Sequence, residues 1–170
     1  HGTAWGAPYP VTFNGLFDAF GAYGGSGATL GLVIALILFS KAKDQKSIAK
    51  LSLAPGIFNI NEMVIFGLPI ILNPIYIIPF VLAPIVNIII GYSATCIFKI
   101  IPPVAYGVPW TTPGPLIPFL GTGGNVLALL IGVLCLAVSV LIYAPFVIAA
   151  GKASQVDDDN SEKDTTEGLA

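Results

Sequence analysis

Between Lys50 and Lys152 the chain carries only two charged side chains, Glu62 and Lys99. Charged residues make up 9% of the whole sequence, whereas soluble domains carry about 25%. The mean hydropathy of +0.88 is equally high. This composition predicts an all-α integral membrane protein, because a helix satisfies its own backbone hydrogen bonds in lipid.

Three apolar stretches are candidates for transmembrane helices. Residues 24–40 begin with glycines, and they reach the roughly 20 residues of a span only if those glycines join the helix. Residues 71–98 form a long apolar helix that three prolines interrupt. Residues 125–149 carry no charge and predict the clearest span.

Two proline-rich apolar stretches, residues 51–74 and 101–124, predict broken or re-entrant segments. We place the first re-entrant segment at residues 51–70. Irregular backbone at membrane depth is tolerated only where it is buried in protein or lines a watery cavity. Paired discontinuous segments of this kind are typical of transporter binding sites.

The remaining stretches set the expected domain boundaries. Residues 1–23 predict a loop or interfacial segment with a short helix near 12–22. Residues 41–50 hold four lysines and predict a cytoplasmic loop by the positive-inside rule. The membrane domain is expected over residues 24–150, and the acidic residues 151–170 predict a disordered cytoplasmic tail.

Several function classes are excluded by what the sequence lacks. The net charge of −2 arises in the acidic tail, and no basic patch suits nucleic acid. Cys96 and Cys135 stand far apart, which argues against a metal or redox pair. His1 is the single histidine, so we expect no metal site, no organic cofactor and no self-contained enzyme. Because the chain begins with His1 and its one methionine is Met63, we expect it to be part of a longer protein.

Glu62 is the first candidate for binding chemistry. A charged side chain at the centre of a membrane helix costs at least ~2.5 kcal/mol, so such groups usually serve a function. With the amides of Asn59 and Asn61 it offers donors and acceptors that suit sugar hydroxyls. The alternative is that Glu62 caps or braces a broken helix.

Two other motifs could contact a ligand. Trp110, held between prolines, could form a flat platform for a sugar ring, and Thr111 could add a hydroxyl; the alternative is a Trp at the membrane interface. Gly25 and Ser26 precede a helix whose N-terminal amides could contact a polar group. The alternative there is close helix packing through small residues.

Four motifs in order resemble the membrane component, enzyme IIC, of bacterial phosphotransferase-system sugar transporters, in the lactose/cellobiose/chitobiose family. These motifs are Gly24-Gly-Ser-Gly-Ala-Thr-Leu-Gly-Leu32, Asn59-Ile-Asn-Glu62 with the following Val64-Ile-Phe-Gly-Leu-Pro69 and Leu72-Asn-Pro74, Val108-Pro-Trp-Thr-Thr-Pro113, and Leu141-Ile-Tyr-Ala-Pro-Phe146. The family usually has proline after the Glu, where this chain has Met63.

The resemblance implies a multi-pass permease of the bacterial plasma membrane that binds and translocates a disaccharide such as cellobiose, lactose or chitobiose. A partner IIB, supplied through IIA, HPr and enzyme I, would phosphorylate the sugar, and no residue of this chain would carry phosphate. Asn61 and Glu62 would contact the sugar and Trp110 would stack on it. The resemblance further implies a homodimer, an elevator-type transport domain and a substrate histidine upstream of this chain.

Two other functions remain open from the sequence. The chain could be a truncated membrane fragment that does not transport. It could also belong to an ion-coupled sugar symporter, which shares broken helices and a midplane Glu.

Overall fold

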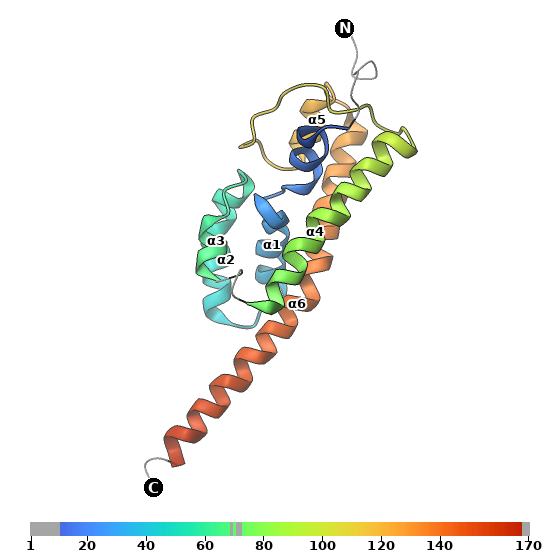
Figure 1. The fold of residues 1–170 in the computed structure, drawn as a ribbon. Coiled ribbons are helices and arrows are strands. Elements are labelled where there is room, and N and C mark those ends of the chain that lie inside the picture. The colour runs from blue at the N-terminus through green and yellow to red at the C-terminus, as the bar shows by residue number, and fades with distance from the viewer. Residues whose placement is uncertain (1–10, 69, 71–72, 168–170) are drawn as a thin grey trace.

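The computed structural model describes residues 11–68, 70 and 73–167, with side chains as far as Lys152. These residues form helices joined by loops, without a strand, as the apolar sequence predicts (Figure 1). Residues 1–10 of the expected N-terminal segment 1–23, His1 included, lie outside the described residues. The expected short helix near 12–22 is present as the π-helix η2 (Asn14–Gly21).

Three helical segments in the described part of the chain are long and apolar enough to cross a membrane. They are Asn14–Phe39, Pro74–Ile97 and Val126–Lys152. The second and third agree with the predicted spans 71–98 and 125–149. The first begins earlier than predicted, because η2 adds its length to the apolar run that follows.

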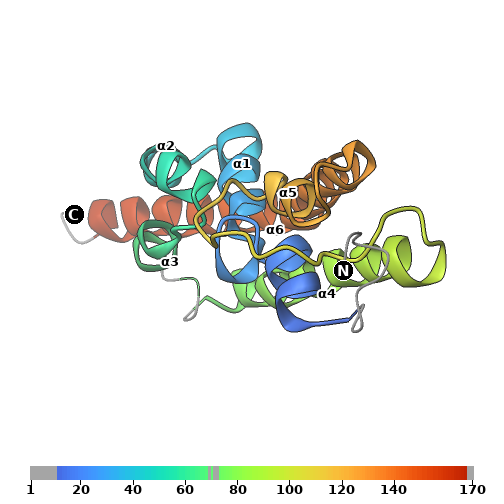
Figure 2. The same ribbon diagram turned by 90° about the horizontal axis from the view of Figure 1, so that it is seen from above.

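The first span is a broken helix at the centre of the molecule. η2 is followed by a short 3₁₀ turn, η3 (Ser26–Ala28), and then by helix α1 (Thr29–Phe39). In the most apolar 18-residue stretch of this span, 61% is buried within the protein, compared with 33% and 28% in the corresponding stretches of the other two spans. Figure 2 shows α1 with other helices on both sides of it and below it. The broken span is therefore the element on which the rest of the fold packs.

Helices α4 (Pro74–Tyr92) and α6 (Val126–Glu167) are the two long helices, and they pack against each other. The side chain of Asn73 caps α4 by accepting a hydrogen bond from the Ile75 N–H, and Pro74 occupies the first helical position, where no donor is needed. A π-helical turn, η5 (Ser93–Ile97), continues α4.

A buried hydrogen bond joins the two long helices. The Asn87 amide donates to the Ser139 hydroxyl at 2.8 Å, and that hydroxyl donates to the Cys135 carbonyl. Apolar side chains fill the space around this contact, in one cluster around α1 and another between η2 and α6.

A helical hairpin flanks α1 on the side away from α4 (Figure 1). It consists of α2 (Lys43–Ile57) and α3 (Glu62–Gly67). The predicted break within residues 51–70 is confirmed by the turn between these helices. The predicted basic loop at 41–50 is wrong, because α2 starts at Lys43. Residues 43–54 contain no glycine or proline that would interrupt a helix before Pro55, and Asp44 in the first turn favours a helix N-terminus.

The segment predicted to be irregular at 101–124 contains one short helix, α5 (Leu116–Gly121), after a long loop. That prediction is confirmed. Beyond it, α6 continues to Glu167 where a disordered acidic tail is predicted from residue 151. Neither proline nor glycine follows Gly151 until Gly168, so nothing in the backbone chemistry ends the helix earlier.

Gly31 allows α1 and α6 to approach closely, and its replacement tests this packing. A Cβ at Gly31 would lie 2.6 Å from the Ser139 Cβ, whereas one at Gly107 would meet nothing within 4 Å. We expect Gly31→Ala to destabilise the protein by roughly 1–3 kcal/mol through overpacking. Gly107→Ala should leave stability nearly unchanged. Thermal unfolding of the full-length protein in detergent measures both, and equal midpoints would contradict the close contact.

Candidate functional site

The break between η2 and α1 forms a loop of glycines at the centre of the site. Gly24 and Gly25 have φ of 79° and 90°, a region that glycine enters without steric cost. A Cβ at Gly25 would lie 2.6 Å from the side-chain carbon Cγ of Asn61. The glycine therefore lets this loop contact the turn between α2 and α3.

Asn59 connects three separate segments from that turn. Its Oδ1 accepts from the Gly24 N–H at 2.8 Å, and its Nδ2 donates to the carbonyls of Trp110 and Thr112 at 2.6 and 2.9 Å. Its own φ of 63° is left-handed, which asparagine tolerates better than most residues. Asn59 is 7% exposed, and the amide's two hydrogens and its oxygen all have partners.

Asn61 makes a second connection to the glycine loop. Its Nδ2 donates to the Ser26 carbonyl at 3.0 Å and lies 3.5 Å from the Ser26 hydroxyl. Its Oδ1 accepts no hydrogen bond within the described residues. One acceptor of this amide is thus available for a ligand.

Tyr143 holds the same loop from α6. Its hydroxyl donates to the Gly27 carbonyl at 2.6 Å, and the side chain is fully buried. The Thr29 hydroxyl donates to the Gly24 carbonyl. These two bonds satisfy carbonyls that the break in the helix would otherwise leave without partners.

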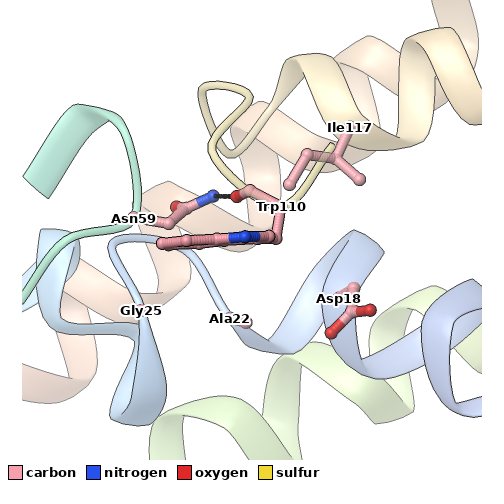
Figure 3. A pocket seen from close by; sticks show the side chains of 6 residues that line it. All are labelled: Asp18, Ala22, Gly25, Asn59, Trp110 and Ile117. Carbon is pink, nitrogen blue, oxygen red and sulfur yellow. Dashed lines mark hydrogen bonds between the residues drawn. The ribbon is translucent and has the colours of Figure 1, made fainter. Parts of the chain in front are cut away.

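A pocket of about 140 Å³ lies beside these contacts. In Figure 3 the Trp110 ring is seen edge-on, between Asn59 and the loop that carries Ala22 and Gly25. Trp110 is 63% exposed, so much of this aromatic surface is open. The residues that line the pocket are Asp18, Ala22, Gly25, Asn59, Trp110 and Ile117.

Asp18 lines this pocket, although the sequence did not lead us to it. It lies on η2, half-buried, and brings a carboxylate to the pocket wall (Figure 3). The signal was present in the sequence, since Asp18 is an ionisable residue between Phe17 and Ala19 in an apolar stretch. π-Helical turns such as η2 also occur frequently at functional sites.

The other predicted site residues are placed differently. Glu62 begins α3 directly after Asn61, where its charge favours the helix N-terminus, and its side chain is exposed and does not line the pocket. Thr111 is exposed in the loop next to Trp110. The structure thus brings Asn59, Asn61 and Trp110 to the glycine loop and leaves the Glu62 carboxylate outside the pocket.

Comparisons with known proteins match most of the chain. Residues 6–84 match the family model described as "Phosphotransferase system, EIIC". A cellobiose-specific EIIC component of Lactococcus lactis is 49% identical over 145 residues, which are 85% of this chain and 29% of that protein. A lactose-specific EIICB component of Staphylococcus aureus is 35% identical over 153 residues, 86% of this chain and 25% of that protein.

The fold also matches a solved transporter. The crystal structure of ChbC, the IIC component of the N,N'-diacetylchitobiose-specific phosphotransferase system, superposes with a TM-score of 0.78 at 40% identity. The match covers 84% of this chain and 33% of ChbC. The chain spans about a third or less of the length of the relatives it matches.

Asn59→Asp tests the connection between the three segments. A carboxylate can still accept from Gly24, but it cannot donate to the carbonyls of Trp110 and Thr112. We expect faster hydrogen exchange of the backbone amides of residues 105–115, measured by mass spectrometry on the full-length protein.

The matched control is Asn125→Asp at the start of α6. The Asn125 side chain only accepts there, from the Leu127 and Ala128 N–H groups, and aspartate caps a helix equally well. If hydrogen exchange in residues 105–115 is the same in Asn59→Asp as in the wild type, the loop does not depend on this amide.

Proposed function

The chain belongs to the EIIC family of the phosphotransferase system, and from this we propose that it binds and translocates a disaccharide of the cellobiose, lactose or chitobiose type. The names of its relatives support this substrate class. As a member of this family with three apolar helices, the chain is part of a multi-pass membrane protein.

The open Trp110 ring beside polar groups is the observation that carries the proposal. A sugar ring has apolar C–H faces and a rim of hydroxyls, so it suits an aromatic surface with amides and carboxylates around it. Ligand pockets usually measure about 300–1,000 Å³, which exceeds the 140 Å³ found here. We infer that this pocket holds one ring and that the second ring lies outside it.

The hydrogen bonds suggest different roles for the two asparagines. Within the described residues the Asn61 Oδ1 accepts no hydrogen bond, and in this proposal it accepts one from a sugar hydroxyl. Asn59 has no unused donor, so its contribution is to hold Trp110 against the glycine loop. Asp18, on the pocket wall, supplies two further acceptor oxygens for hydroxyls.

Glu62 would act at the hydroxyl that receives phosphate. Its carboxylate is exposed and follows Asn61 directly, so a sugar and a phosphate donor can both approach it. A carboxylate in hydrogen-bond reach of a hydroxyl can orient it and accept its proton as general base.

The phosphate donor in this proposal is a partner IIB, itself supplied through IIA, HPr and enzyme I. The name of the Staphylococcus aureus relative, EIICB, indicates that IIC and IIB components can share one chain. We further propose that the full-length protein acts as a homodimer.

Replacing Glu62 tests the proposed chemistry. We expect Glu62→Gln to reduce phosphorylation of the labelled disaccharide by at least about a hundredfold, as is typical for loss of general base catalysis. Sugar binding should change far less, because glutamine keeps an acceptor oxygen. The assay is phosphoenolpyruvate-dependent uptake by cells that express the full-length protein and its partners.

The same assay separates the other functions. Accumulation of unmodified sugar without phosphoenolpyruvate would identify an ion-coupled symporter. If the sugar is phosphorylated normally in cells that express Glu62→Gln, Glu62 acts only at the N-terminus of α3.

Replacing Trp110 tests the stacking surface. A stacking contact of about 1 kcal/mol corresponds to an affinity loss of roughly five- to tenfold. We expect that loss for Trp110→Ala in a direct sugar-binding measurement, with most of the affinity retained by Trp110→Phe. Tyr106→Ala is the control, since Tyr106 is another exposed aromatic of the same loop, at 51% against 63% for Trp110, and does not line the pocket. Equal effects of the two alanine variants would count against stacking on Trp110.

A further inference from the structure

One outward face of α2 changes from basic to apolar along its length. Lys43, Ser47 and Lys50 follow one another on this face at helical spacing, and all are exposed. The same face continues with Leu51 and Ala54, and Phe58, the residue directly after α2, extends it; all three are exposed, Leu51 to 64% and Phe58 to 51%. Lys46 stands at its edge, partly buried.

This change from basic to apolar residues along the axis of α2 determines how the helix can lie against a membrane. An amphipathic helix that lies flat on a bilayer has polar and apolar residues on opposite faces. In α2 the basic and the apolar residues share one face and are separated along the helix. The helix axis is therefore inclined to the membrane plane, with the basic end at the membrane surface. From Lys50 to Ile57 the helix rises about 10 Å, roughly a third of the hydrocarbon thickness.

The basic end of α2 lies where the membrane spans end. The last residues of α1, the start of α2 and the start of α4 are at the same end of the bundle (Figure 1). Lys41, in the link from α1, is exposed there as well. This is the level at which a lysine side chain meets lipid headgroups.

Within the described residues these lysines are not neutralised. None of Lys41, Lys43, Lys46 and Lys50 makes an ion pair there, and Asp44 is the single acidic residue in residues 41–50. Four positive charges and one negative charge leave this end of α2 with an excess of cations at the membrane surface.

We propose that this face of α2 is a binding surface for anionic phospholipid, with Lys43, Lys46 and Lys50 at the headgroups and Leu51, Ala54 and Phe58 against the acyl chains. Charge complementarity selects an anionic headgroup, and the apolar continuation of the same face selects a lipid over a water-soluble acidic protein. The proposal does not depend on the sugar or on the partner IIB.

The test uses the full-length protein in detergent, titrated with phosphatidylglycerol or with phosphatidylcholine, and counts bound lipids by native mass spectrometry. Each lysine near an anionic surface contributes a factor of about five in affinity. We therefore expect the triple variant K43Q/K46Q/K50Q to bind phosphatidylglycerol about a hundredfold more weakly, with binding of phosphatidylcholine unchanged. The corresponding triple arginine variant should bind like the wild type.

Lys99→Gln is the matched control, because Lys99 is an exposed lysine in the loop at the far end of α4. It should leave phosphatidylglycerol binding unchanged. Wild-type affinity in the triple glutamine variant would overturn the proposal. So would a triple variant that keeps its lipid but no longer supports phosphorylation of the sugar by IIB, since the lysines would then contact a protein partner.

Discussion

A helix that breaks inside a membrane must find hydrogen-bond partners within the protein, because lipid offers none. The break between η2 and α1 leaves backbone groups of Gly24, Ser26 and Gly27 without helical partners. Three side chains supply the missing bonds: Asn59 and Asn61 from the turn between α2 and α3, and Tyr143 from α6. The hairpin of α2 and α3, the long loop before α5 and the helix α6 are positioned around this one requirement.

The pocket arises from the same requirement. The amide that satisfies Gly24 also holds the carbonyl of Trp110, so the aromatic ring is placed beside the glycines as a result of backbone satisfaction. The glycines in turn leave room that any side chain would fill. A site for a ring-shaped ligand is thus built largely from groups whose first role is structural.

Apolar runs and prolines predicted α4, the apolar part of α6 and the irregular segment before α5, because hydrophobicity and backbone restriction are local properties. The segment 41–50 was mispredicted because its lysines suggested a solvated loop, although nothing in it breaks a helix until Pro55. The motifs led to the right family, and they singled out Asn59, Asn61 and Trp110, which the structure brings to the glycine loop. They did not reveal that the Asn59 amide is fully used, since its partners are 35, 51 and 53 residues away. Asp18 went unnoticed beside the aromatic residues of η2.

The three bonds of Asn59 also have a mechanical consequence. Gly24, the hairpin turn and the segment 110–112 are fastened to one side chain, so none of them can shift without the other two. In a permease, a pocket held together in this way would keep its shape wherever the surrounding helices move it. Its affinity for the ligand would then be similar on both sides of the membrane. The direction of net transport would have to come from the covalent change made to the ligand.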